Sequence, residues 1–302
     1  MAAMRRLEVM FFSDGTALAG RFFLPADAKL ARPRPCIIAT GSWLTVKEQM
    51  AQLYAERLAE RGFTTFIFDF VGFGQSAGAP RQLEHPVRKI ADIIAAVEFV
   101  RTMSFVDADA VGYLGICASA QYAMAAAARG AKLRALASVA GWFHDAGSVA
   151  PFYGGDDGVA MRLERANDAA LMFAATGKMP IVPAYAAGDD RAGMFIPLEY
   201  YNSLARGAIP AWSNAMAEAS WTYWLTFDGL RAASEAAIPA AFVHSEQAVF
   251  PDHIRAVAIA MREDVKQFWT EGDQIQFYDE PKQVTFALDA LTPWFVQTLG
   301  GS

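Results

Sequence analysis

The chain has 302 residues, of which 54% are hydrophobic and 19% charged, so it can bury a large core and is not expected to be disordered. Its formal net charge of -6 at pH 7 argues against a nucleic-acid partner, because nucleic-acid binding requires a clustered basic surface. The two cysteines, Cys36 and Cys117, provide neither a disulfide framework nor a CxxC zinc pair, so no metal is expected. The sequence shows no hydrophobic signal core and no apolar run of about 20 residues, so we expect a cytoplasmic protein without a membrane partner.

Short apolar runs alternate with helical patterns along most of the chain. A hairpin is predicted at 7–13 and 17–24, joined at Asp14-Gly15, a dipeptide typical of such turns. Strands follow at 35–40, 64–68, 110–114 and 136–140, with helices at 47–61, 84–103 and 117–129. The alternation stops at Gly141 and resumes at Pro239, with strands at 239–244 and 265–269 and helices at 252–261 and 284–299. The pattern predicts an α/β fold with a mostly parallel eight-stranded sheet and helices on both faces.

Residues 146–238 do not follow this alternation and are rich in aromatic side chains, including Trp212, Trp221 and Trp224. A connection of this length without structure is rare in a compact domain. We therefore expect a helical cap at 146–238, inserted into a core of residues 1–145 and 239–302. The inner face of such a cap would form the wall of a substrate site, and its composition favours an apolar or aromatic small molecule as the partner.

One candidate for a catalytic nucleophile is Ser76, in the sequence G-Q-S-A-G at 74–78, which matches the G-x-S-x-G pattern. However, Ala79-Pro80 follow and no helix begins at Ser76, so we interpret the segment as a glycine-rich turn. Its glycines also miss the G-x-G-x-x-G spacing and no P-loop lysine follows, so no nucleotide or other cofactor is expected.

The segment V-G-Y-L-G-I-C-A-S-A at 111–120 has the context that a nucleophile needs. A buried strand ends there, a helix begins within a few residues, and the small residues Gly115 and Ser119 flank Cys117. The positive end of a helix dipole stabilises a thiolate at such a position. We therefore interpret Cys117 as the nucleophile, and Cys36, which lies within an apolar strand, as a buried core residue.

This segment resembles the nucleophile elbow of the α/β-hydrolase superfamily, in the branch with a cysteine nucleophile typified by dienelactone hydrolase. A-T-G-S-W at 39–43 is similar to the fold's oxyanion loop, and D-F-V-G-F-G-Q-S at 69–76 to its Asp-x-x-Gly-x-Gly-x-Ser turn. The likeness extends to polyketide-transferase-like hydrolases. It implies that the backbone amides of Ala118 and of Ser42 or Trp43 stabilise an oxyanion, with about 3 kcal/mol per donor.

The usual triad is broken at two of its three positions. Ala248 stands about where the family's aspartate belongs, and Gln274 stands in place of its histidine. An amide takes no proton at neutral pH, so the acid–base work would fall to His144, with Asp145 as its orienting partner, or to Glu246. The alternative for His144 is a loop residue that holds the cap. Residues expected to line the substrate pocket are Gln274, Trp142 and Asp145.

Three functional hypotheses remain open. The first is an enzyme that acts through Cys117 on a small apolar or aromatic ester, thioester or lactone. If neither His144 nor Glu246 can activate water, the acyl-cysteine would pass to another nucleophile, which predicts a non-hydrolytic transferase, cyclase or lyase of secondary metabolism. The third is a non-catalytic small-molecule-binding protein that retains the fold. The sequence leaves the identity of the substrate and the existence of a homodimer open.

Overall fold

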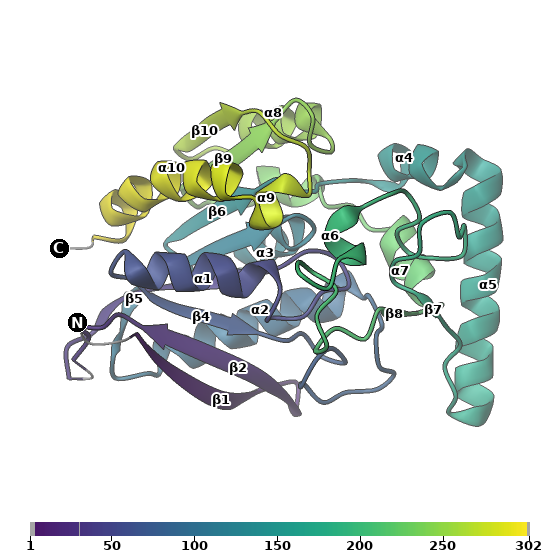
Figure 1. Ribbon diagram of the computed structural model, residues 1–302, viewed down its shortest axis with the longest axis horizontal. Coiled ribbons are helices and arrows are strands. Elements are labelled where there is room, and N and C mark those ends of the chain that lie inside the picture. The colour runs from purple at the N-terminus through teal and green to yellow at the C-terminus, as the bar shows by residue number, and fades with distance from the viewer. Residues whose placement is uncertain (1–3, 30, 301–302) are drawn as a thin grey trace.

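A computed structural model describes residues 4–29 and 31–300, so residues 1–3, 30 and 301–302 of the predicted core lie outside the described residues. The main sheet has eight strands in the order β1-β2-β4-β3-β5-β6-β9-β10. Pairing is antiparallel between β1 and β2 and between β2 and β4, and parallel elsewhere. This confirms the predicted mostly parallel eight-stranded sheet (Figure 1). Its strands are β1 (Arg5–Ser13), β2 (Thr16–Leu24), β3 (Arg34–Thr40), β4 (Thr64–Phe68), β5 (Val106–Ile116), β6 (Ala135–Val139), β9 (Ala240–Ser245) and β10 (Val265–Thr270).

Helices cover both faces of the sheet. One face carries α1 (Met50–Glu60) and α10 (Pro281–Leu299), and the other carries α2 (Pro86–Arg101), α3 (Ser119–Ala128) and α8 (Pro251–Ala260) (Figure 1). The strand β4 is buried at every position, as expected for a strand covered on both faces. The short helix α9 (Gln276–Asp279) follows β10.

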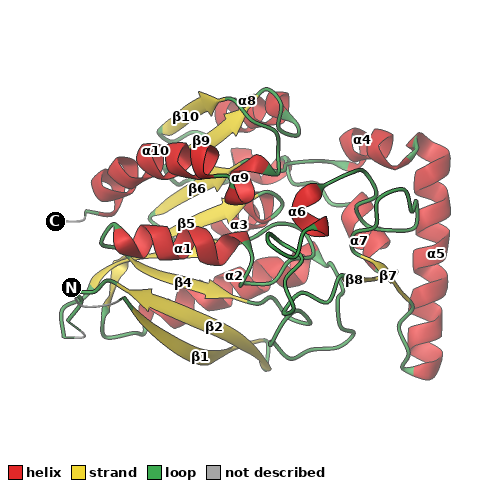
Figure 2. Cartoon of the chain, viewed as in Figure 1, coloured by secondary structure: helices red, strands yellow, loops and turns green. Residues whose placement is uncertain are grey.

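Residues 146–238, here called the insert, form a separate group of elements beside the sheet, with few strands (Figure 2). β7 and β8 pair only with each other, so within the described chain the insert adds no strand to the main sheet. This two-stranded sheet differs from the helical cap that the sequence predicts for residues 146–238. The elements of the insert are α4 (Ala146–Val149), η1 (Ala150–Tyr153), α5 (Gly155–Thr176), β7 (Ile181–Pro183), α6 (Glu199–Asn202), β8 (Ala215–Ala217), α7 (Ser220–Leu225) and η2 (Arg231–Ser234).

Candidate active site

Cys117 lies at a sharp turn between β5 and α3. Its φ of 56° is in the left-handed region, which residues other than glycine rarely adopt. The Cys117 amide donates to the carbonyl of Val139 at 3.1 Å, and the Cys117 carbonyl accepts from the amides of Ala120 at 3.1 Å and Trp142 at 3.0 Å. A Cβ atom on Gly115 would lie 2.6 Å from the Cα of Ala120, so only glycine fits where helix and strand meet. This is the geometry of a nucleophile elbow.

A cavity of about 350 Å³ opens in front of Cys117. Its walls are contributed almost equally by the core and by the insert, and most of the lining side chains are aromatic or aliphatic. The core supplies Ser42, Trp43, Cys117, Trp142, Gln247, Val249, Asp273, Gln274, Ile275 and Tyr278. The insert supplies Phe152, Tyr153, Gly193, Met194, Phe195, Ile196, Pro197, Leu198, Tyr201 and Trp224. The cavity thus brings together five of the residues that the sequence predicts for the site: Ser42, Trp43, Cys117, Trp142 and Gln274.

A chain of three hydroxyl groups lies in the wall of the cavity that Cys117 lines. Its first member is Tyr278, on α9. The Tyr278 hydroxyl lies 3.2 Å from Ser42 Oγ, which accepts a 3.0 Å hydrogen bond from the hydroxyl of Tyr201, on α6 of the insert. Burial, followed by the neighbouring Cys117 side chain, raises the pKa of Tyr278 well above its ordinary value, and burial does the same to the pKa of Tyr201. Both phenols therefore remain neutral at physiological pH.

Gln274 occupies the loop after β10 and faces the same cavity. Its Nε2 donates to the carbonyl of Ala140 at 2.7 Å and to the hydroxyl of Tyr278 at 3.4 Å. Its Oε1 accepts from the amide of Val249 at 3.2 Å. Gln274 therefore joins the loops after β6, β9 and β10 and holds the hydroxyl of Tyr278 in place.

Two backbone amides near Cys117 are free to stabilise a negative charge. Among the hydrogen bonds of the described residues, the amides of Trp43 and Ala118 donate to no acceptor. The amide of Ser42, in contrast, points at the sulfur of Met50 at 3.4 Å. The geometry therefore favours Trp43 over Ser42 as the second predicted oxyanion donor, and Ser42 contributes its hydroxyl instead.

A buried ion pair holds the loop that carries Trp43. Glu84 is fully buried, and its carboxylate accepts from Lys89 Nζ at 2.7 Å, from the Tyr122 hydroxyl at 2.7 Å and from the amide of Leu44 at 3.3 Å. The amide of Glu84 donates to Ser220 Oγ of the insert at 2.9 Å. Every polar atom of the carboxylate is satisfied, as a buried charge requires. This cluster links the loop after β3, α2, α3 and the insert.

The expectation that His144 faces the cavity is corrected by the structure. His144 is fully buried, and both of its ring nitrogens are engaged. Nδ1 accepts from the indole of Trp142 at 2.8 Å, and Nε2 lies 2.9 Å from the carbonyl of Trp224. Burial lowers the pKa of His144 to about 4, so the ring is neutral at physiological pH. His144 joins the loop after β6 to the insert, which is the alternative role considered above.

Asp145 and Glu246 also lie away from the cavity. The Asp145 carboxylate accepts from the amide of Ser148 at 2.8 Å and caps α4, and this bond holds the pKa of Asp145 below its usual value. Glu246 is 62% exposed and pairs with Arg255 at the surface. Neither residue is among those that line the cavity in the described chain. The expectation that Asp145 lines the pocket is thus corrected, and the carboxylate of Glu246 is paired with Arg255 at the surface and does not line the cavity.

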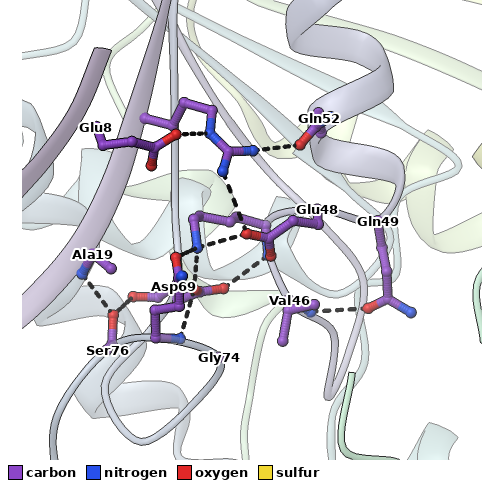
Figure 3. Close-up of polar contacts among 12 residues, drawn as sticks. Glu8, Ala19, Val46, Glu48, Gln49, Gln52, Asp69, Gly74 and Ser76 are labelled. Carbon is purple, nitrogen blue, oxygen red and sulfur yellow. Dashed lines mark hydrogen bonds and ion pairs between the residues drawn. The ribbon is translucent and has the colours of Figure 1, made fainter. Parts of the chain in front are cut away.

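Ser76 belongs to a structural turn. Its hydroxyl accepts from the amide of Ala19 at 2.9 Å and donates to the carbonyl of Asp69 (Figure 3). The side chain is 1% exposed. The motif at 74–78 therefore fixes the loop after β4, as the sequence context indicates.

Tyr201 and Tyr278 were not identified from the sequence. Tyr278 lies four residues beyond Gln274, on a single turn of helix, and Tyr201 is 159 residues from its partner Ser42. One sequence feature points to Tyr278: it lies one helical turn after Gln274, the residue that the resemblance places at the family's histidine position. Within the described ranges, no three His, Cys, Asp or Glu side chains are grouped to hold a metal ion, and no helix could cross a membrane.

Parts of this sequence are similar to those of known proteins. Residues 14–162 match the family described as X-Pro dipeptidyl-peptidase (S15 family). Uncharacterized protein YcjY of Escherichia coli (strain K12) is 27% identical over 301 residues, which cover 94% of this chain and 95% of that protein. Thiohydrolase aneE of Aspergillus aculeatus is 32% identical over 133 residues, covering 44% of this chain and only 40% of that protein.

A solved structure shares the fold over the full length. The crystal structure of the alpha/beta hydrolase GrgF from Penicillium sp. sh18 superposes with a TM-score of 0.82, covering 98% of this chain and 99% of that chain. The sequence identity is 20%, so this likeness establishes the fold alone.

Proposed function

Because this chain is a hydrolase-fold enzyme of the α/β-hydrolase superfamily, we propose that Cys117 is its nucleophile and that it forms an acyl-cysteine from a small apolar or aromatic ester, thioester or lactone. One observation carries the proposal: Cys117, at φ 56°, lines a largely apolar cavity into which two unpaired amides can donate. In this mechanism the thiolate attacks the substrate carbonyl. The amides of Trp43 and Ala118 hold the oxyanion and contribute about 3 kcal/mol each.

The residues that line the cavity favour a substrate whose acyl group carries no charge. Aromatic side chains from both the core and the insert enclose it, and no lysine, arginine or histidine lines it among the described residues. The single lining carboxylate, Asp273, is exposed, and its Oδ1 accepts from the amides of Ile275 and Gln276 at 3.1 Å. A charged acyl chain would lose its hydration without gaining an ionic partner. The printed name of the relative aneE, a thiohydrolase, adds support for a thioester among the three classes.

A second candidate function, acyl transfer, is favoured by the absence of an evident base. Hydrolysis of an acyl-cysteine requires a group that activates water. The histidine nearest in sequence to the site, His144, is engaged on both nitrogens, and Gln274 stands in the usual histidine position. An acyl-cysteine with this surrounding should persist until an amine, alcohol or carbon nucleophile enters the cavity. The product would then be an amide, ester or ketone, or a lactone if the nucleophile belongs to the same molecule.

Intact-mass spectrometry of the protein with activated acyl donors tests the proposal. We expect p-nitrophenyl and thiophenyl benzoate to add one benzoyl group to Cys117, located by peptide mapping, within a single turnover. The Cys117→Ala variant should gain no adduct, whereas the matched Cys36→Ala variant should behave as wild type. Donors with a terminal carboxylate, such as the p-nitrophenyl monoester of adipic acid, should react far more slowly. Turnover that survives Cys117→Ala would overturn the assignment, and an accumulating adduct would favour transfer over hydrolysis.

A further inference from the structure

The loop that carries Trp43 contains a strained residue. In the turn formed by residues 42–45, the amide and the hydroxyl of Thr45 donate to the carbonyl of Ser42 at 3.4 and 2.5 Å. Leu44, the third residue of this turn, has a φ of 59°, in the left-handed region where glycine or asparagine is usual. Its side chain is fully buried. A leucine keeps such a conformation only where the surrounding structure holds it.

Two side chains hold the peptide groups on either side of Leu44. The carboxylate of Glu84 accepts from the amide of Leu44 at 3.3 Å and fixes the peptide that precedes this residue. The indole Nε1 of Trp212 donates to the carbonyl of Leu44 at 2.8 Å and fixes the peptide that follows it. Because peptide groups are planar, the orientations of these two planes determine the φ and ψ of Leu44. Glu84 belongs to the core, whereas Trp212 belongs to the insert, 168 residues beyond Leu44.

The same turn sets the direction of the Trp43 amide. In a trans peptide the C=O and N–H groups point in opposite directions. Since the carbonyl of Ser42 points at Thr45, the N–H of Trp43 points away from the turn, and among the hydrogen bonds of the described residues it has no acceptor. A change in the dihedral angles of Leu44 would open the turn and redirect this amide.

From this arrangement we propose that Trp212 is a positioning residue for the oxyanion hole. Its indole N–H holds the strained Leu44 and thereby keeps the amide of Trp43 directed at the substrate oxygen. The inference rests on the proposed function, in which this amide donates to the oxyanion that forms when Cys117 attacks.

Further contacts between the insert and this loop agree with the role of Trp212. The ring of Trp212 packs against Tyr201, with 5.4 Å between the ring centroids, and the hydroxyl of Tyr201 donates to Ser42 Oγ at 3.0 Å. Beyond the turn, Gln49 Nε2 donates to the carbonyl of Gly207 at 2.7 Å. The insert therefore holds the loop on both sides of Leu44, and the Trp43 donor is in place only when the insert is seated on the core.

Two reactions of the same sulfur test this role. Acylation by p-nitrophenyl benzoate passes through a tetrahedral oxyanion, whereas iodoacetamide reacts by displacement of iodide at a saturated carbon and forms no oxyanion. For Trp212→Phe we expect the single-turnover acylation rate to fall about 10-fold to 100-fold, up to the loss of one oxyanion donor, while alkylation of Cys117 changes by less than about twofold. Trp294→Phe is the matched control, because Trp294 is equally buried, lies on α10 and is not among the lining residues of the described chain. It should react as wild type in both assays.

A second substitution separates the N–H group from the shape of the indole. Trp212→β-(3-benzothienyl)alanine replaces the N–H by sulfur and retains the size of the ring, so the packing against Tyr201 is kept. We expect this variant to show the same selective loss of acylation. It also decides the question if the smaller phenylalanine prevents folding.

The outcomes separate the positioning role from the nucleophile. Equal losses of acylation and alkylation would assign Trp212 a packing role and overturn the inference, as would unchanged acylation in the benzothienylalanine variant. In either case, loss of acylation in Cys117→Ala would leave the proposed function standing. Acylation that persists in Cys117→Ala would instead overturn the proposed function itself.

Discussion

The side-chain nitrogen of Gln274 donates a 2.7 Å hydrogen bond to the carbonyl oxygen of Ala140. This bond ties the loop after β10 to the end of β6, beside the turn that carries Cys117. Through its other contacts Gln274 also fixes Val249 and Tyr278. The position that the family resemblance assigns to a histidine is thus occupied by an amide that positions its neighbours.

Restoring the missing triad members should create a generic esterase. Gln274→His places an imidazole in the cavity, and Ala248→Asp supplies a carboxylate next to Val249, which contacts Gln274 in the wild type. We expect the double variant to hydrolyse p-nitrophenyl acetate at least about 100-fold faster than wild type, because a base then activates water for deacylation. Gln274→Asn serves as the control that changes the loop without adding a base. A folded double variant with no gain would mean that deacylation is not limited by the absent base.

The two thiols should differ sharply in reactivity. Cys117 lines the cavity, whereas Cys36 is fully buried within β3, where desolvation raises its pKa far above the ordinary value. We expect iodoacetamide to label Cys117 first, as measured by peptide mapping over time at neutral pH. An apolar benzoyl donor added beforehand should protect Cys117. Preferential labelling of Cys36 in the folded protein would contradict the elbow geometry.

Removing the cation of the buried pair should destabilise the protein strongly. Lys89→Met leaves the carboxylate of Glu84 buried without its charge partner, and we expect the free energy of unfolding to fall by about 3 to 5 kcal/mol. The double variant with Glu84→Gln should lose less than the sum of the single variants. Arg57→Met is the control, because Arg57 and Glu60 form an ion pair at 3.0 Å with side chains 55% and 54% exposed. Its effect in urea denaturation should stay within about 0.5 kcal/mol.

His144 should make the protein sensitive to acid. Its pKa is lowered from 6.5 to about 4 in the folded state, so below pH 6.5 the unfolded chain binds a proton that the folded chain does not. The free energy of unfolding therefore falls as the pH drops through this range, by about 2 kcal/mol from His144 between pH 7.5 and 5. Asp92, whose pKa is raised to about 6, acts in the opposite direction, and His244 acts in the same direction.

The contribution of His144 can be isolated by difference. His144→Asn retains His244 and Asp92, so its loss of stability between pH 7.5 and 5 should be smaller than that of wild type by about 2 kcal/mol. Urea denaturation at the two pH values measures this difference. Parallel curves for the two proteins would show that His144 is not held neutral.

Local sequence patterns predict the core elements because each pattern has a direct physical cause. The run at 64–68 coincides with β4, all of whose residues are buried, as expected for a strand covered on both faces. The helices predicted at 84–103 and 284–299 begin instead at Pro86 and Pro281, because proline is favoured in the first turn of a helix. The prediction for Cys117 rests on the same kind of local pattern: strand, small residue, cysteine, small residue and helix succeed one another within a few positions.

The rest of the site depends on contacts between distant segments, which no local pattern encodes. His144 is at the sheet edge as expected, but its direction is set by bonds to Trp142 and to Trp224, 80 residues further along the chain. Tyr201 and Ser42 meet across the boundary between the insert and the core. The pairing of β7 with β8 is equally non-local, since three-residue strands carry too little periodicity to be recognised.

The positive φ of Cys117 implies that this protein is less stable than its fold would allow. A residue with a Cβ atom in the left-handed region costs roughly 1 to 2 kcal/mol, whereas glycine adopts it freely. Cys117→Gly should therefore melt at a higher temperature than Cys117→Ala, although both variants lack the proposed nucleophile. At this one position, thermal stability and the placement of the Cys117 sulfur are therefore opposed.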